Sequence, residues 1–180
     1  MPRPNVLLVC ADHWPARLLG CAGHPDILTP TLDQLAGNGI HFTRAYSTTP
    51  ICIPARRDLM TGTTPRTHGD RTFKEQEPMP AGLPTMPQTF RDAGYQAFAV
   101  GKLHFYPQRA RIGFDDVIGH EEGRHHVGGA DDYERHLADA GYAGREYTHA
   151  MGSNVYTTRP WHLPEALHAT NWTVREMSRR

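Results

Sequence analysis

The stretch that decides the fold is the apolar run Asn5-Val-Leu-Leu-Val-Cys-Ala11, which ends at Asp12. A short, continuous apolar run of this kind is typical of a parallel strand that is buried in a sheet. Asp12 and His13 would then stand at the carboxyl end of that strand, where open α/β sheets bind their ligands. The run is also too short, and too soon followed by Asp12, to be the apolar region of a signal peptide. We therefore expect a cytoplasmic protein.

Further strand and helix signals alternate along the chain. Residues 40–46 and 95–100 predict two more strands, and Thr29-Pro30 predicts the capped start of a helix, with proline in its first position. The expected helices are short and span residues 31–36, 55–60, 87–93, 130–140 and 164–177. This repeated order of strand, loop and helix predicts an α/β fold with a mostly parallel sheet and flanking helices.

The composition is that of an ordinary globular chain, with 180 residues, 19 Lys plus Arg, and 19 Asp plus Glu. This balance argues against nucleic-acid binding, which needs a basic surface to displace the counterions of phosphate. No apolar run approaches the roughly 20 residues that span a bilayer, so we expect no membrane partner. The three cysteines, Cys10, Cys21 and Cys52, contain no C-x-x-C pair and argue against a disulfide framework.

Polar residues that carry chemistry follow two predicted strands and open one predicted helix. They are Asp12-His13, the segment from Cys52 to Arg56, and Lys102 with His104. The start of a helix favours an anion, and Arg56 and Lys102 add cationic donors that can hold a tetrahedral oxyanion. Asp12 indicates a cation on the opposite side. A metal, an arginine and a lysine around one oxyanion are typical of a hydrolase.

The segment Cys52-Ile-Pro-Ala-Arg56 resembles the C-x-P-S/A-R signature of type I sulfatases, which belong to the alkaline phosphatase-like superfamily. Gly101-Lys-Leu-His104 is similar to the family's G-K-x-H motif. Other stretches in the family's order are residues 4–12, 29–33 and 59–62. The close resemblance covers residues 3–105, and a loop-rich remainder covers 106–180. Residues 1–180 are thus expected to form the N-terminal part of a catalytic domain with the sulfatase fold, truncated because the family is normally more than twice as long.

The resemblance implies an arylsulfatase-like enzyme that hydrolyses a sulfuric ester. In this family the signature cysteine is oxidised to formylglycine, so Cys52 would become an aldehyde whose hydrate attacks sulfur. The second hydroxyl of the hydrate then expels sulfate and restores the aldehyde. Arg56 would hold the formylglycine, Lys102 would bind a sulfate oxygen, and His104 would hydrogen-bond the nucleophile or the sulfate. The implied partners are a small sulfate ester and the formylglycine-generating enzyme.

The resemblance also implies a divalent cation, usually calcium, with Asp12, His13 and the modified Cys52 as its ligands. His13 stands where the family commonly has a second Asp, and an imidazole favours manganese, zinc or iron over calcium. Calcium takes six to eight oxygen ligands. We find no second pair of metal ligands before Arg180, so we expect this chain alone to be inactive.

Two alternatives to a sulfatase stay open. His13 in place of Asp favours a phosphonate monoester or phosphodiester hydrolase of the same superfamily, and the missing second metal pair favours a non-catalytic fragment that binds oxyanions. Arg57-Asp58 replaces the small residues that usually follow the signature. Phe73 and Lys74 stand where many relatives have an Asn after the segment that corresponds to His68-Gly69.

Overall fold

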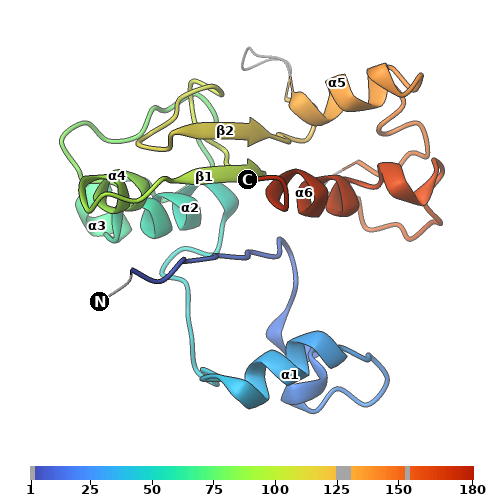
Figure 1. Ribbon diagram of the computed structural model, residues 1–180, viewed down its shortest axis with the longest axis horizontal. Coiled ribbons are helices and arrows are strands. Elements are labelled where there is room, and N and C mark those ends of the chain that lie inside the picture. Colours follow the sequence, from blue (N-terminus) through green and yellow to red (C-terminus); the bar gives the residue numbers. More distant parts are fainter. Residues whose placement is uncertain (1–2, 125–130, 153–154) are drawn as a thin grey trace. The chain divides into compact units, whose positions relative to one another are not determined.

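A computed structural model describes residues 3–124, 131–152 and 155–180. The chain divides into two compact units, unit 1 (Met1–Tyr46) and unit 2 (Ser47–Arg180). The helix α1 (Pro30–Asn38) belongs to unit 1, whereas the sheet and the other helices labelled in Figure 1 belong to unit 2.

Unit 1 is organised around the start of α1 (Pro30–Asn38), which confirms the helix predicted there. The Thr29 hydroxyl accepts a hydrogen bond from the Gly20 N–H at 2.8 Å and donates one to Asp33 Oδ1 at 2.8 Å. The same Asp33 oxygen accepts from the Cys21 N–H at 2.7 Å. These bonds tie the short 3-10 turn η2 (Gly20–Ala22) to the first turn of α1.

Neither strand predicted in unit 1 is present. Residues 5–11 and 40–46 have no regular hydrogen-bonded structure. In the first of these segments, the exposed fractions are 71% for Leu7 and 79% for Val9. A strand needs a neighbour that pairs with its backbone and a second layer that covers its side chains. The described residues of unit 1 provide neither, so the prediction of a buried first strand is wrong for this structure.

The sheet of unit 2 consists of β1 (Phe98–Gly101) and β2 (Asp116–Gly119). The two strands are parallel, and their register runs from Phe98 opposite Asp116 to Gly101 opposite Gly119. The parallel arrangement and the strand at β1 confirm the prediction. β2 was not predicted, because four residues that begin with a charged side chain carry little periodic signal.

Within the described residues of unit 2, the sheet is accompanied by five short α-helices and a 3-10 turn: α2 (Cys52–Thr61), α3 (Pro65–His68), α4 (Met86–Asp92), α5 (Asp132–Asp139), η4 (Glu165–Leu167) and α6 (Ala169–Met177). α2 begins at Cys52, before the predicted residue 55, because Pro54 in the first turn needs no hydrogen-bond acceptor. The helix predicted at 164–177 is split at His168, whose side chain caps α6 by accepting from the Thr170 N–H. Ala130, in the predicted segment 130–140, lies outside the described residues. Among the described residues, no helix has both the length and the apolar character needed to cross a membrane.

Two apolar clusters cover opposite faces of the sheet. One is formed by Met60, Ala99, Leu103, Phe105 and Phe114, and the other by Tyr133, Leu137, Leu163 and Trp172. Within β1, Ala99 belongs to the first cluster and Val100 packs against the second. Val117 and Ile118 divide in the same way, because successive side chains of a strand point to opposite faces. Unit 2 is therefore an α/β arrangement with helices on both faces of a parallel sheet.

Candidate active site

The candidate site lies where the two parallel strands of unit 2 end. β1 ends at Gly101 and leads into Lys102 and His104, whereas β2 ends at Gly119 and leads into residues 120–122. Because Gly101 and Gly119 are opposite each other in the register, both polar segments emerge at the same edge of the sheet.

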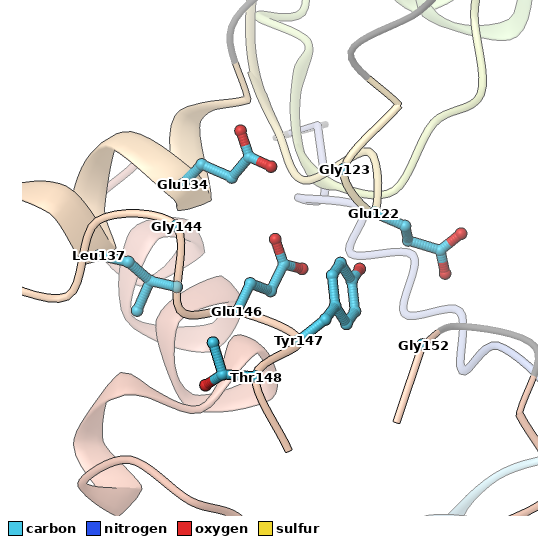
Figure 2. A pocket seen from close by; sticks show the side chains of 9 residues that line it. All are labelled: Glu122, Gly123, Glu134, Leu137, Gly144, Glu146, Tyr147, Thr148 and Gly152. Atoms are coloured by element: carbon cyan, nitrogen blue, oxygen red, sulfur yellow. The ribbon is translucent and has the colours of Figure 1, made fainter. Parts of the chain in front are cut away.

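A cavity of about 610 Å³ opens beside this edge. Its walls include three carboxylate side chains, Glu122, Glu134 and Glu146, together with the ring of Tyr147 (Figure 2). Among the described residues that line the cavity, none is a lysine, arginine or histidine. Glu122 is the wall residue that also reaches the residues of the G-K-x-H motif.

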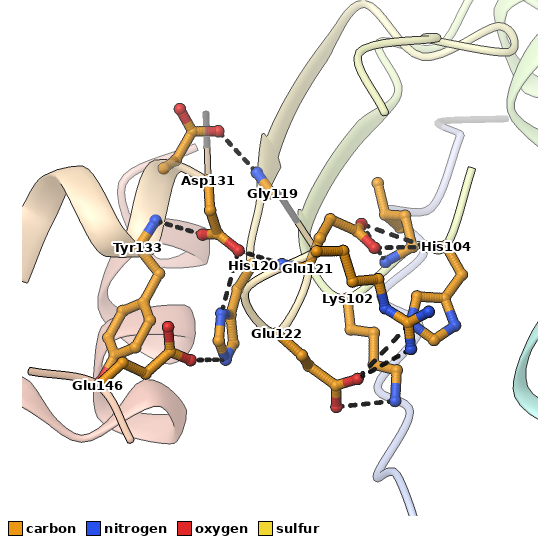
Figure 3. Close-up of polar contacts among 12 residues, drawn as sticks. Lys102, His104, Gly119, His120, Glu121, Glu122, Asp131, Tyr133 and Glu146 are labelled. Atoms are coloured by element: carbon orange, nitrogen blue, oxygen red, sulfur yellow. Dashed lines mark hydrogen bonds and ion pairs between the residues drawn. The ribbon is translucent and has the colours of Figure 1, made fainter. Parts of the chain in front are cut away.

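Lys102 and His104 both contact the carboxylate of Glu122 (Figure 3). Lys102 Nζ lies 2.8 Å from Glu122 Oε1, and His104 Nε2 lies 3.6 Å from Glu122 Oε2. Arg124 Nη2 lies 3.4 Å from the same Oε2. The side chains of Lys102, Glu122 and Arg124 are each between 12% and 16% exposed, so these charges interact largely out of water.

The helix α2 adds Cys52 and Arg56 to this group. Cys52 is the first residue of α2, and Arg56 stands one turn later on the same side of the helix. Arg56 Nη1 donates a hydrogen bond to the Lys102 carbonyl at 2.5 Å, and Lys102 Nζ lies 3.8 Å from Cys52 Sγ. The structure thus brings together all four residues that were predicted from the two motifs.

The unusual pair Arg57-Asp58 fastens α2 to the segment that follows it. The Arg57 side chain is 5% exposed, and its Nε lies 2.7 Å from Asp70 Oδ2. The same guanidinium donates to the carbonyls of Glu77 and Pro78. These contacts give Arg57 a packing role next to the signature.

A buried carboxylate, Glu121, holds the backbone of the G-K-x-H motif. Its oxygens accept hydrogen bonds from the Leu103 N–H at 2.8 Å and from the His104 N–H at 3.0 Å. His104 has a φ of 56°, a left-handed conformation that costs free energy for a residue with a Cβ and is maintained by its surroundings. Asp131 in turn accepts from the Glu121 N–H, so the carboxylate is itself held in place. Burial raises the pKa of Glu121, although the two backbone hydrogen bonds act in the opposite direction.

The electrostatics of the site keep His104 neutral and Glu122 ionised. Burial lowers the pKa of His104 to about 4, and the positive charges of Arg124, Lys102 and Arg56 act in the same direction against the hydrogen bond with Glu122. Burial alone would raise the pKa of Glu122, but hydrogen bonds from His104 and Lys102 hold it well below its usual value. At neutral pH, His104 is therefore an imidazole without charge, and the Lys102 ammonium lies 3.8 Å from Cys52 Sγ.

A family model described as Sulfatase matches residues 4–160 of the chain. This match includes the signature, the G-K-x-H motif and the strand β2 with the carboxylates that follow it. The chain belongs to the sulfatase family.

Individual sulfatases and their structures agree with this assignment. The chain is 31% identical over 191 residues to an arylsulfatase of Clostridium perfringens, a match that covers 97% of this chain and 38% of that protein. The crystal structure titled Ps i-CgsB in complex with k-i-k-neocarrahexaose is 32% identical with a TM-score of 0.53, over 59% of this chain and 25% of that one. The phosphonate monoester hydrolase of Agrobacterium radiobacter is 22% identical with a TM-score of 0.70, over 98% of this chain and 38% of that one, and shows the shared fold. The chain thus spans well under half the length of each of these three proteins.

The predicted metal ligands are divided between the two units. Asp12 and His13 belong to unit 1, where Asp12 Oδ1 lies 3.9 Å from His13 Nε2 and both side chains are accessible to solvent. Cys52 belongs to unit 2, so ligation of one metal by all three residues stays a prediction. One carboxylate and one imidazole fit part of a divalent-cation site, but they fill less than half of the six to eight positions that calcium takes.

Sequence reasoning missed the part of this candidate site that follows β2. Glu121, Glu122 and Arg124 belong to no motif that was recognised, and β2, which positions them, was not predicted. A usable signal was present, because the polar run His120-Glu-Glu122 follows the short apolar segment Val117-Ile118. The same rule that singled out Asp12, a polar residue directly after a buried strand, applies to this run.

Proposed function

We propose that the chain supplies the nucleophile and the oxyanion-binding residues of an arylsulfatase-like enzyme that hydrolyses a small sulfuric ester. The observation that carries this proposal is the approach of Lys102 Nζ to within 3.8 Å of Cys52 Sγ at the start of α2. A cation beside a nucleophile at a helix N-terminus is suited to an ester whose oxygens are negatively charged. The family membership supports the same reaction.

In this proposal Cys52 is converted to formylglycine by the formylglycine-generating enzyme. The hydrated aldehyde supplies an oxygen nucleophile for sulfur and a second hydroxyl whose deprotonation releases sulfate. Arg56 keeps Lys102 in place through its hydrogen bond to the Lys102 carbonyl. Lys102 binds a sulfate oxygen and stabilises the charge that develops on it. His104, neutral at pH 7 because of its burial, exchanges a proton with the nucleophile or hydrogen-bonds the sulfate.

The proposed cofactor is a divalent cation. Asp12 would give a carboxylate oxygen, which suits calcium, and His13 would give an imidazole nitrogen, which suits manganese or zinc. A bound cation would polarise the sulfuryl oxygens. The remaining ligands of the cation would have to come from beyond Asp12, His13 and Cys52.

A second candidate is a phosphonate monoester or phosphodiester hydrolase that uses the same nucleophile. His13 favours this candidate, because an imidazole stands where sulfatases commonly have a second carboxylate. Paired assays on an aryl sulfate and an aryl phosphonate separate the two reactions. A rate with the sulfate at least tenfold above that with the phosphonate supports the sulfatase, and the reverse order supports the alternative.

The first experiment is mass spectrometry of the peptide that contains Cys52, from protein produced together with the formylglycine-generating enzyme. Conversion of the thiol to the aldehyde lowers the mass of this peptide by about 18 Da, a covalent change that defines the mechanism. The peptides with Cys10 and Cys21 serve as internal controls, because they lie outside the signature and should keep their mass. A Cys52 peptide that retains the full thiol mass would contradict the proposed nucleophile.

A further inference from the structure

The carboxylate of Glu122 occupies the position beside Lys102 and His104 in which the proposed enzyme would bind the sulfate group of its substrate. One of its oxygens lies 2.8 Å from Lys102 Nζ, and the other lies 3.6 Å from His104 Nε2 (Figure 3). This second oxygen also lies 3.4 Å from Arg124 Nη2. The two oxygens of one carboxylate thus lie within 3.6 Å of three nitrogens, of which Lys102 Nζ and Arg124 Nη2 donate hydrogen bonds. A sulfate group bound at Lys102 and His104 would use the same donors.

The backbone of Glu122 is in an unfavourable conformation where the side chain makes this contact. Its φ is 58°, in the left-handed region that is unfavourable for a residue with a Cβ. Glu122 also forms part of the wall of the cavity of about 610 Å³ (Figure 2). The cavity provides space into which the carboxylate can turn when another anion approaches Lys102.

We propose that Glu122 is an internal counter-anion that occupies the oxyanion position of the free protein and restricts this site to esters with a single negative charge. This inference rests on the proposed function and specifies its substrate class. An incoming ester must take the place of the carboxylate at Lys102. The displaced carboxylate stays within a side chain's length of the bound ester, and its repulsion grows in proportion to the charge of the ester.

The rest of the cavity gives no compensation for a second negative charge. Glu134 and Glu146 also line it, and none of its described lining residues carries a positive charge. The side chain of Glu146 is 9% exposed, its Oε1 lies 3.6 Å from His120 Nε2, and the carboxylate interacts with the Tyr147 side chain beside it. A leaving group that enters the cavity should therefore be neutral or carry an amine, which can donate to Glu146. Esters with additional sulfate or carboxylate groups are disfavoured.

The proposal is tested by the binding of two anions that differ in charge. Methyl sulfate carries one negative charge, and inorganic sulfate carries two. Isothermal titration calorimetry measures the affinity of each anion for the 180-residue chain and for its Glu122→Gln variant at one fixed ionic strength. We expect the substitution to tighten methyl sulfate about tenfold and inorganic sulfate about a hundredfold, because the repulsion that it removes doubles with the charge. Equal gains for the two anions, or weaker binding by Glu122→Gln, would overturn the proposal.

Glu134→Gln is the matched control, because it removes the same charge from the same cavity and leaves the carboxylate at Lys102 in place. It should change the affinity for either anion less than threefold, because the charge of Glu134 is farther from Lys102 and is screened more strongly. If Glu134→Gln reproduces the full effect of Glu122→Gln, then general repulsion explains the result and the proposal fails.

A measurement on the unchanged chain covers the case in which Glu122→Gln does not fold. With carbon-13 in the glutamate carboxyl groups, saturation with inorganic sulfate should shift the Glu122 resonance as the carboxylate leaves Lys102. A Glu122 resonance that stays fixed while the Lys102 resonance responds would overturn the displacement. The proposed reaction is tested separately by the modification of Cys52. If Cys52 were never modified, the reaction would be contradicted, but Glu122→Gln should still increase the affinity for inorganic sulfate more than the affinity for methyl sulfate.

Discussion

The two units of this chain show what a buried element requires. Unit 1 contains one buried residue among its described residues 3–46, the Thr29 that joins η2 to α1. Its apolar segment, residues 6–9, is at least half exposed throughout. Unit 2 instead buries two apolar clusters on opposite faces of a sheet of only two strands. An apolar run specifies that a segment can be buried, but its pairing partner and covering layers decide whether it becomes a strand.

The largest expected difference between the units concerns chemistry at cysteine. Cys52→Ala removes the proposed nucleophile of unit 2 and should lower sulfatase turnover at least about a thousandfold in the protein that carries this chain, with the fold retained. Cys10→Ala in unit 1 should leave turnover within about twofold, because Cys10 is outside the proposed machinery. The initial rate on an aryl sulfate measures both. Normal turnover by Cys52→Ala would refute the covalent mechanism.

The next difference concerns packing. Leu137 in unit 2 is 1% exposed, so Leu137→Ala should lower the free energy of unfolding by about 3 kcal/mol through lost burial and a residual cavity. Leu7 in unit 1 is 71% exposed, and Leu7→Ala should cost no more than about 0.5 kcal/mol. Urea denaturation followed by circular dichroism compares the two. A cost for Leu7→Ala as large as that for Leu137→Ala would show that residues 6–9 are buried in solution.

The contrast between the units also shows which parts of the fold could be predicted. The helices α1, α2 and α4 depend on local signals, such as Pro30 in a first turn and Gly62 after the last one, and these signals are present in the sequence itself. The strand at residues 5–11 was predicted from apolarity alone and is absent. β2 is present although its four residues carry little signal. Strand pairing depends on residues far apart in the chain, and one sequence does not reveal them.

The residues of the candidate site also fall into those that local sequence predicts and those that depend on strand pairing. Cys52, Arg56, Lys102 and His104 lie at a predicted helix start and after a predicted strand, and also in two short motifs of a known family. Both signals predicted that they act together, and the structure places them within one group. Glu122 reaches that group because the register of β1 and β2 sets their ends side by side. No spacing in the sequence encodes this contact. The acidic half of the site therefore became visible only in three dimensions.

A smaller difference is expected between two carboxylates that organise backbone N–H groups. Glu121 in unit 2 is 3% exposed, and Glu121→Ala would leave the buried N–H groups of Leu103 and His104 without an acceptor, at a cost of about 3 kcal/mol. Asp33 in unit 1 accepts from the exposed Cys21 N–H, which water can satisfy, so Asp33→Ala should cost about 1 kcal/mol. Thermal denaturation of both variants provides the measurement.

Glu121→Gln is the conservative control for this pair. An amide oxygen still accepts from one or both N–H groups, so Glu121→Gln should recover most of the stability that Glu121→Ala loses. A second readout is the shift of the His104 backbone N–H resonance, which should move strongly in Glu121→Ala and little in Glu121→Gln. Equal losses of stability in Glu121→Ala and Asp33→Ala would contradict the distinction between a buried and an exposed acceptor.

The smallest expected effect is the pH dependence of stability that arises from two histidines of unit 2, the buried His104 and the half-buried His120. Burial lowers the pKa of His104 from 6.5 to about 4, so the folded state favours the neutral imidazole. Its contribution to stability is complete above pH 6.5 and is lost as the pH falls towards 4, because the unfolded chain binds a proton that the folded chain refuses. Between pH 7 and pH 5, the stability of the chain relative to His104→Gln should therefore fall by about 2 kcal/mol.

His120 provides a comparison of opposite sign. Burial acts to lower its pKa, but the hydrogen bond to Asp131 and the charge of Glu146 outweigh burial and raise it above 6.5. Its contribution is therefore present below pH 6.5 and is lost as the pH rises through the folded-state pKa. Relative to His120→Gln, the chain should gain stability between pH 7 and pH 5, whereas relative to His104→Gln it should lose stability. Denaturant titrations of the three proteins at both pH values measure these changes. If the chain gained stability between pH 7 and pH 5 relative to His104→Gln, the pKa of His104 would be raised by folding, and its proposed action as a neutral group beside Lys102 would be excluded. A loss relative to His120→Gln would contradict the prediction for His120 alone.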